Sequence, residues 1–290
     1  MTNIPLHFSQ GTVRPNIGPN LSYLAAEQIC SSTLWKKFPK AFRGEYVDDW
    51  DCKKETSYWY VIKDTPFDIS ELKAKRRYEI TKAKRNFIVK KIKSDSETSI
   101  KSMFDVYNEA ITDYLFAPPR YSLEEFHRSI KAWWHYDSKL GGGREMIVYG
   151  AYDTDNKLCG FAHVIKYRDH CSFSTLKTRP SAESKGINAA ICYKIILDCN
   201  DDLLKGNFFI SDGARNLSHV THFQDYLQKY FGFRKAYCRL RVVYRPLFKP
   251  IIAILFLFKN FLKKFDSYSL FHKINAILLA EEVSRDCKLE

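Results

Sequence analysis

Apolar residues recur at helical spacing in several stretches of the chain. Met103, Tyr107 and Ile111 are separated by about one turn each, which predicts an amphipathic helix. Ser122 followed by Glu125 is a capping-box sequence and predicts the start of another helix. The same reasoning predicts helices at residues 21–36, 70–85, 100–114, 123–135, 187–197 and 218–230.

Shorter apolar runs between these helices predict strands. Residues 86–92 alternate in polarity, whereas NFFIS at 207–211 is a continuous run typical of a buried strand. Three of the strands follow one another through short turns and predict an antiparallel meander, at 146–152, 158–167 and 171–178. The remaining strands are predicted at 58–63, 86–92, 207–211 and 236–244.

From residue 86 the predicted order is strand, helix, helix, three strands, helix, strand, helix, strand. This mixed order predicts an α/β fold of the α+β type, with one sheet covered by helices.

The last strand of the meander leads into a loop and a helix with the sequence LKTRPSAESKGINAAICY. The first N–H groups of a helix have no intrahelical partner, and the helix dipole favours negative charge there. We therefore expect an anion cradle whose backbone N–H groups come from Gly186, Ile187, Asn188 and Ala189, with Lys185 and Arg179 as charge partners. An ordinary helix start, with Gly186 relieving a tight turn, is the alternative.

A second candidate site follows the predicted strand at 207–211. Asp212 stands just past the end of this strand, and Arg215 and His219 follow within a few residues. Asp212 or His219 could act as a general base, and Arg215 could bind a carboxylate or phosphate. The alternatives are a turn carboxylate at Asp212, a first-turn helix residue at His219 and a helix-covering side chain at Arg215.

The formal net charge of +13 is unevenly distributed. Basic residues crowd residues 72–93 and again residues 234–264, and the second stretch holds no acid. Such clusters are typical of proteins with polyanionic partners, although solvated helix faces have the same composition.

The amino-acid composition narrows the class of protein further. An apolar content of 45% in 290 residues supports a substantial core. The eight Cys stand singly, with no C-x-x-C pair, so neither a metal site nor a redox motif is predicted. No signal segment follows Met1, and buried reduced thiols suggest a cytoplasmic protein.

The longest apolar run, IIAILFLF at 251–258, is shorter than a membrane span. Residues 250–265 instead have the pattern of an amphipathic helix. It would either dock on the protein's own core or lie on the inner face of the membrane.

The predicted order of elements resembles that of the GNAT acyltransferase superfamily. Three stretches are similar to its FemAB-like branch of aminoacyl and acyl transferases: KAKRRYEITKAKR at 73–85, MFDVYNEA at 103–110 and FQDYLQKYFGFRKAYCRLRVVY at 223–244. At the phosphate-binding loop the family usually has Gln or Arg, Gly, and then Gly or Ala. This chain has Glu183, Gly186 and Asn188 at those places.

The resemblance implies a single GNAT-like sheet, mixed and mostly antiparallel, with helices on its faces. It implies three segments: an N-terminal extension at 1–85, an acyltransferase domain at 86–247 and a C-terminal amphipathic helical tail at 248–290. Acetyl-CoA or another acyl-CoA would be the donor, and an amine of a small molecule or of the cell envelope the acceptor.

Two other functions remain open. An aminoacyl-tRNA-dependent transferase would bind tRNA through residues 73–93. A non-catalytic protein would bind polyanions or a membrane surface, the latter through residues 250–265.

Overall fold

The computed structural model describes residues 4–112, 120–134, 144–217 and 222–286. The chain folds into two compact units. Unit 1 comprises Met1–Val61, Ala214–His222 and Lys235–Glu290, and unit 2 comprises Ile62–Gly213 and Phe223–Arg234. This division differs from the three segments expected at 1–85, 86–247 and 248–290, which stay a prediction.

Unit 2 contains the predicted meander. Its strands lie in the order β9-β8-β7-β6-β5, where β5 to β8 are antiparallel and β8 and β9 are parallel. The mixed, mostly antiparallel sheet expected from the sequence is thereby confirmed. The bounds of these strands are β5 Ile88–Lys91, β6 Glu145–Tyr152, β7 Leu158–Lys166, β8 His170–Thr178 and β9 Phe209–Ala214.

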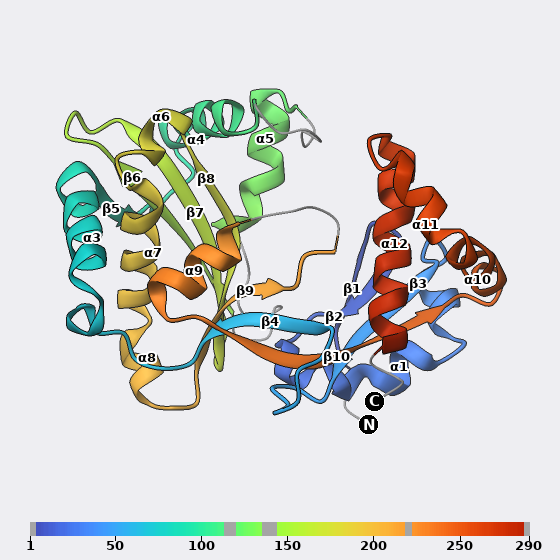
Figure 1. Cartoon of the computed structure of the whole chain (residues 1–290). Helices are drawn as coiled ribbons and strands as arrows, with labels where there is room; N and C mark the ends of the chain where they lie inside the picture. The colour runs from blue at the N-terminus through green and yellow to red at the C-terminus, as the bar shows by residue number, and fades with distance from the viewer. Residues whose placement is uncertain (1–3, 113–119, 135–143, 218–221, 287–290) are drawn as a thin grey trace. The chain divides into compact units, whose positions relative to one another are not determined.

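Helices cover both faces of the sheet of unit 2. Successive side chains of a strand point to opposite faces, so two neighbouring residues of β6 contact different helices. Val148 of β6 packs in a buried cluster with Met103 and Phe126, which belong to two helices on one face. The next residue, Tyr149, donates from its hydroxyl to Asp198 of a helix on the other face (3.0 Å). The helices are α3 Ala74–Asn86, α4 Glu97–Ala110, α5 Leu123–Ile130, α6 Pro180–Glu183, α7 Ile187–Asp198, α8 Asn200–Leu204 and α9 Phe223–Phe231, with 3-10 turns η2 Ile69–Glu71 and η3 Lys131–Trp133 (Figure 1).

Local sequence signals place several of these helices. The Ser122 side chain accepts from the Glu125 N–H, and Glu125 accepts from the Ser122 N–H, so the predicted capping box is confirmed. Asp68 caps η2 instead of α3, which begins only at Ala74. The helix expected at 218–230 begins at Phe223 as α9, and residues 218–221 lie outside the described part of the chain.

Of the strands in unit 1, the sequence analysis predicted β4 and β10, at 58–63 and 236–244, and missed the first three. The strands of this unit lie in the order β1-β2-β3-β10-β4, with β2 and β3 parallel and β3 and β10 antiparallel. The first two form a hairpin through Gln10 and Gly11, which have φ of 50° and 76° and thus suit a two-residue turn. The bounds are β1 Leu6–Ser9, β2 Thr12–Pro15, β3 Arg43–Asp48, β4 Tyr58–Lys63 and β10 Arg234–Tyr244.

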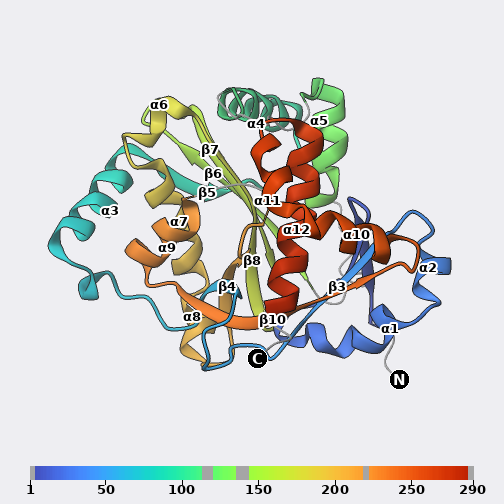
Figure 2. The same cartoon turned by 45° about the vertical axis from the view of Figure 1, so that its right-hand side comes forward.

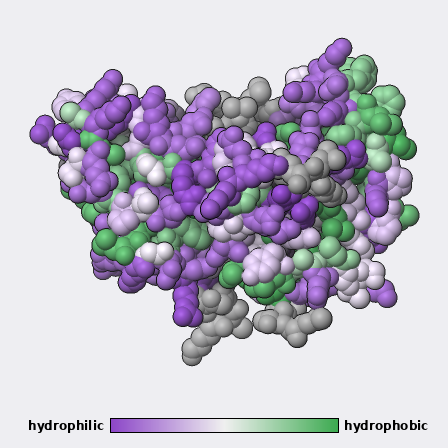
Figure 3. Space-filling view, turned by 60° about the horizontal axis from the view of Figure 1, so that its bottom comes forward, coloured by the Kyte–Doolittle hydropathy of each residue, from purple (hydrophilic) through white to green (hydrophobic). Residues whose placement is uncertain are grey.

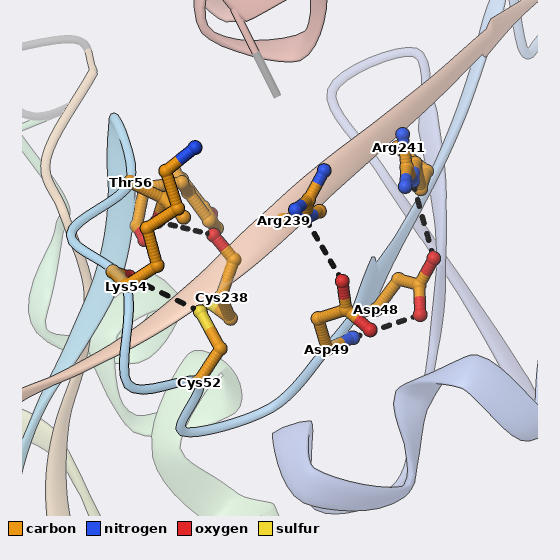
Figure 4. A network of polar contacts seen from close by, with 9 residues as sticks. Asp48, Asp49, Cys52, Lys54, Thr56, Cys238, Arg239 and Arg241 are labelled. Carbon is orange, nitrogen blue, oxygen red and sulfur yellow. Dashed lines mark hydrogen bonds and ion pairs between the residues drawn. The ribbon is translucent and has the colours of Figure 1, made fainter. Parts of the chain in front are cut away.

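The segment between β3 and β4 is held against β10 by polar contacts (Figure 4). Arg239 pairs with Asp49 at 2.8 Å. The Thr56 hydroxyl donates to the Cys238 carbonyl at 2.7 Å. These contacts bind residues 49–57 to the neighbouring strand, which explains how a connection without regular structure keeps one path.

The helices of unit 1 differ from the prediction near both ends of the chain. The helix expected at 21–36 is broken, because Ser31 takes an extended conformation after α1. Residues 269–286 form the longest helix, α12, and α10 and α11 pack against it (Figure 2). The helices are η1 Pro19–Ala25, α1 Ala26–Cys30, α2 Leu34–Lys37, α10 Phe248–Leu257, α11 Lys259–Leu262, η4 Lys263–Phe265 and α12 Ser269–Asp286.

Residues 250–265 do not dock on the core as one helix. They are divided among α10, α11 and η4, and α10 buries only Ile252. Among the described residues, no helix is both long and apolar enough to cross a membrane.

Candidate functional site

The start of α7 has the geometry expected of an anion cradle. Gly186 is its N-cap in the left-handed conformation (φ 88°, ψ 24°), and no side chain caps the helix. The N–H groups of Ile187, Asn188 and Ala189 therefore lack the intrahelical acceptors that later residues have. Lys185 precedes them and is exposed. The start of the helix can thus donate hydrogen bonds to an anion.

Helix α3 runs beside this helix start (Figures 1 and 2). A Cβ placed on Gly186 would be 3.1 Å from the Cβ of Ala83, so the two backbones approach closely. The Asn86 side-chain amide donates to the Lys185 carbonyl at 3.0 Å. The basic helix α3 and the candidate cradle are consequently neighbours.

Burial differs among the cradle residues. Ile187 and Ala189 are buried and help to anchor α7 on the sheet. The Asn188 side-chain oxygen is also buried and has no hydrogen-bond partner within the described structure. A buried oxygen of this kind needs a donor, since burial without one costs about 1–3 kcal/mol.

Arg179, predicted as a charge partner of the cradle, is engaged elsewhere. It is buried, its Nη1 forms an ion pair with Glu109 of α4, and its Nε donates to the Leu158 carbonyl at 3.0 Å. These contacts fix the end of β8 against α4. They leave Lys185 as the exposed cation next to the helix start.

Asp212 lies near the end of β9 and is largely buried. Burial raises the pKa of its carboxyl to about 7, although a hydrogen bond from Gln224 of α9 acts to lower it. Its charge also contributes, after burial itself, to raising the pKa of the Cys192 thiol in α7. A carboxyl with a pKa near neutrality can take up and release a proton under ordinary conditions.

The local turn at Asp212 differs from the alternative that the sequence left open. The Gly213 N–H donates to the Ser211 hydroxyl at 2.9 Å, and Gly213 has a φ of 92°. The Ser211 side chain, rather than that of Asp212, thus supports the turn. Gln224, the partner of Asp212, was not predicted, because no local motif links a strand end to a residue of the following helix.

The other two predicted catalytic residues are Arg215 and His219. Arg215 belongs to unit 1, where its Nη1 donates to the Ser57 carbonyl (2.6 Å) and its guanidinium lies 4.9 Å from the Trp59 ring centre. His219 lies outside the described residues. No group of three or more His, Cys, Asp or Glu able to hold a metal ion occurs in the described part of the chain.

We compared the fold of this chain with the folds of solved structures. FemX superposes with a TM-score of 0.51 at 10% identity, over 79% of each chain. The L-PGS structure from Bacillus licheniformis gives a TM-score of 0.46 at 10% identity, over 87% of this chain and 83% of that one. A tandem GNAT protein from the clavulanic acid biosynthesis pathway gives 0.46 at 9% identity, over 81% and 75%.

The likeness to FemX agrees with the fold that the predicted resemblance implies. At 10% identity the match to FemX concerns the fold alone. No protein-family model matches the sequence, and the comparison with curated proteins found no relative.

Proposed function

We propose that this chain is a transferase that moves an acyl group from an activated carrier, such as an acyl-CoA, to an amine. Three features support the proposal: the GNAT-type fold, the uncapped start of α7 and the buried carboxyl of Asp212. The observation that carries most weight is the helix start after β8, with Gly186 as N-cap and no side-chain cap. In this arrangement the phosphates of the carrier would accept from the first N–H groups of α7.

The reaction needs a neutral amine. The amine nitrogen attacks the acyl carbon, the new C–N bond forms, the C–S bond to the carrier breaks, and the amine gives up one proton. Asp212 would accept this proton directly or through a water molecule, because its pKa of about 7 lets it be ionised at neutral pH and still hold a proton. The departing thiolate is protonated in turn, so the products are an amide and a free thiol.

Donor binding can be tested by thermal melting with acetyl-CoA, longer acyl-CoAs and free coenzyme A. A ligand that binds only the native state raises the melting temperature. We expect such a rise for the wild type and a smaller one for Lys185→Ala. Lys157→Ala, which removes an exposed lysine from a turn between strands, is the matched control and should behave as the wild type. Unchanged melting with every carrier would contradict an acyl-CoA donor.

The role of Asp212 can be tested separately by turnover with a panel of amines. Asp212→Asn should keep the fold and lower turnover by at least about tenfold, as expected when a general base is lost. Normal turnover of the variant would remove Asp212 from the mechanism, whatever the donor.

One structural relation favours a second donor, an aminoacyl-tRNA. Helix α3 lies beside the start of α7, and its Lys75, Lys82 and Arg85 are exposed. Their positive charges could bind RNA phosphates next to the cradle. Binding of tRNA would then weaken steeply with salt, and replacing these three residues by Ala would flatten that dependence. Replacing Lys101, Lys131 and Lys157 instead, three exposed lysines of unit 2 outside α3, should leave it unchanged.

A further inference from the structure

Unit 1 contains a cavity of about 850 Å³. Strands β2, β3 and β4 supply part of its lining and α12 another part. Its volume falls within the range of roughly 300–1,000 Å³ that is usual for small-molecule sites. None of the residues discussed for the transfer reaction lines it, apart from Arg215.

The charge of this cavity is strongly positive. Arg14, Arg43, Arg215 and Lys273 line it, and Glu45 is the one acid among its described lining residues. One carboxylate cannot neutralise four cations, so the cavity favours an anionic ligand.

Glu45 holds two of the arginines in place. Its two carboxylate oxygens pair with Arg14 Nε at 2.7 Å and with Arg43 Nε at 2.9 Å. The Thr12 hydroxyl lies 3.3 Å from the same Arg43 nitrogen. Both guanidinium groups are therefore oriented before any ligand arrives, which lowers the entropy cost of binding.

Arg43 has a hydrogen-bonding capacity that the described residues do not use. The residue is 9% exposed, and its Nη1 has no hydrogen-bond partner in the part of the chain that the structure describes. A buried charged donor without an acceptor is costly, and an anionic oxygen in the cavity would satisfy it. This nitrogen is the most specific indication of a ligand.

Another part of the cavity lining is apolar. Phe42 contributes a ring, and Ala276, Ile277 and Ala280 contribute the side chains of α12. Burial raises the pKa of Tyr58, which also lines the cavity, so its hydroxyl stays protonated as a donor. The lining thus offers both cationic donors and apolar surface.

We propose that this cavity binds a small anionic molecule with an apolar portion, whose phosphate or carboxylate group is held by Arg43 and Arg14. Lys273 and Arg215 add positive charge to the same cavity. This site does not depend on the proposed transfer reaction or on Asp212.

The probes that test this proposal share one apolar tail and differ in the head group. Hexyl phosphate and hexanoate are the anions, hexyltrimethylammonium is the cation, and inorganic phosphate lacks the tail. Melting temperatures and calorimetric titrations of the full chain are measured with each. At least one tailed anion should bind and stabilise the protein, and the comparison of the two shows which head group is preferred. Equal stabilisation by the cation, or none by either anion, would overturn the proposal.

Variants locate the binding. Arg14→Gln and Lys273→Ala should each weaken the anion about tenfold or more, as expected for losing one charged contact. Lys101→Ala, an exposed lysine of unit 2, makes the same charge change as Lys273→Ala elsewhere and should bind like the wild type. Equal weakening in this control would mean nonspecific charge attraction and would overturn the site. Arg43→Gln is the sharpest variant, and if it does not fold, Arg14→Gln and Lys273→Ala decide the question.

A different observation carries a second proposal, about α10 and α11. Large apolar side chains on these helices are exposed, among them Leu257 at 79% and Ile254 at 58%. Four of them recur at intervals of three and four residues, so they share one face of the helix. That series is Leu247, Ile251, Ile254 and Phe258. Hydrophobic residues gather at the right-hand edge of Figure 3, where α10 lies in Figure 1.

The segment that carries this apolar face has charge of one sign in its own sequence. Residues 245–265 contain five basic side chains and no acid. Lys259 pairs with Glu282 of α12, whereas Lys249, Lys263 and Lys264 are exposed. An apolar face bordered by lysines matches an anionic bilayer, where apolar side chains enter the interface and lysines meet the head groups.

We infer that α10 and α11 dock on an anionic lipid surface. Sedimentation with vesicles should show binding to phosphatidylcholine mixed with phosphatidylglycerol, and little binding to phosphatidylcholine alone. Ile254→Ser with Leu257→Ser should abolish it. Leu197→Ser with Leu204→Ser, two exposed leucines of unit 2, is the matched control. Equal binding by both variants, or a dimer in light scattering that is lost with Ile254→Ser and Leu257→Ser, would overturn the lipid assignment.

Discussion

Ala83 of α3 lies against Gly186 at the start of α7, so closely that a Cβ on Gly186 would come within 3.1 Å of the Ala83 Cβ. The contact joins the basic helix to the candidate cradle. It also needs glycine for a second reason, because Gly186 has a φ of 88°.

Gly186→Ala should destabilise unit 2 for both reasons. The left-handed conformation costs an L-residue roughly 1–2 kcal/mol, and the added methyl group must push α3 away. Gly206→Ala is the matched control, since Gly206 has a φ of 79° and nothing lies within 4 Å of its added Cβ. Urea denaturation should show a larger loss for Gly186→Ala. Equal losses would mean that the contact with Ala83 costs nothing.

The ion pair of Arg179 and Glu109 predicts that replacing Arg179 lowers the free energy of unfolding more than breaking an exposed ion pair does. Arg179→Met removes a buried cation and leaves the Leu158 carbonyl without its donor, so we expect a loss of roughly 2–3 kcal/mol. Arg128→Met breaks an exposed pair with Glu124 and should change the free energy of unfolding by less than about 0.5 kcal/mol. Similar effects of the two changes in chemical denaturation would show that Arg179 has no special role in fixing β8.

Asp212 predicts that stability falls as pH rises. Its folded pKa of about 7 lies above its ordinary value of 3.8, so between these pH values the native state keeps a proton that the unfolded chain has lost. The contribution of Asp212 to stability should therefore be lost across this window, by up to about 4 kcal/mol. Asp212→Asn removes this pH dependence. The free energy of unfolding of the variant minus that of the wild type, measured by urea denaturation at each pH, should therefore increase from pH 4.5 to pH 8. A constant difference would contradict the raised pKa.

The lowered pKa of His163 gives a pH dependence of stability with the opposite sign. It stacks on Trp133 with ring centres 4.3 Å apart, and burial lowers its pKa from 6.5 to about 4. Between these values the unfolded chain binds the proton that the native state excludes, so this contribution to stability is lost as pH falls, by about 3 kcal/mol at most. His163→Phe should keep the stacking on Trp133, and on acidification its free energy of unfolding should fall less than that of the wild type.

The two pH effects overlap and partly cancel in the wild type. Single variants are therefore more informative than the wild-type profile. We expect Asp212→Asn to lose stability mainly on acidification and His163→Phe to lose it mainly as pH rises toward 7. If both variants followed the wild-type curve, neither group would have the environment that the structure describes.

Short-range patterns allowed much of unit 2 to be predicted. The capping box of Ser122 and Glu125, the helix after Gly186 and the meander of three strands all arise from residues within a few positions of one another. Strands β1 and β2 were missed because they have only four residues each, and β3 was missed although it pairs with the distant strand β10. The candidate cradle could be located from its glycine, but α3 as its neighbour could not.

The amino-acid sequence by itself determined the capping box of Ser122 and Glu125, the order of the three meander strands and where positive charge accumulates, because caps, periodicity and charge are local properties of the chain. Only the tertiary structure decided that Arg179 pairs with Glu109, 70 residues away, and that Asp212 is buried enough for its pKa to reach about 7. It also brought Arg14 of β2 and Arg43 of β3 to the same carboxylate, that of Glu45. These properties depend on burial and on contacts between distant segments, and both arise only when the chain is packed.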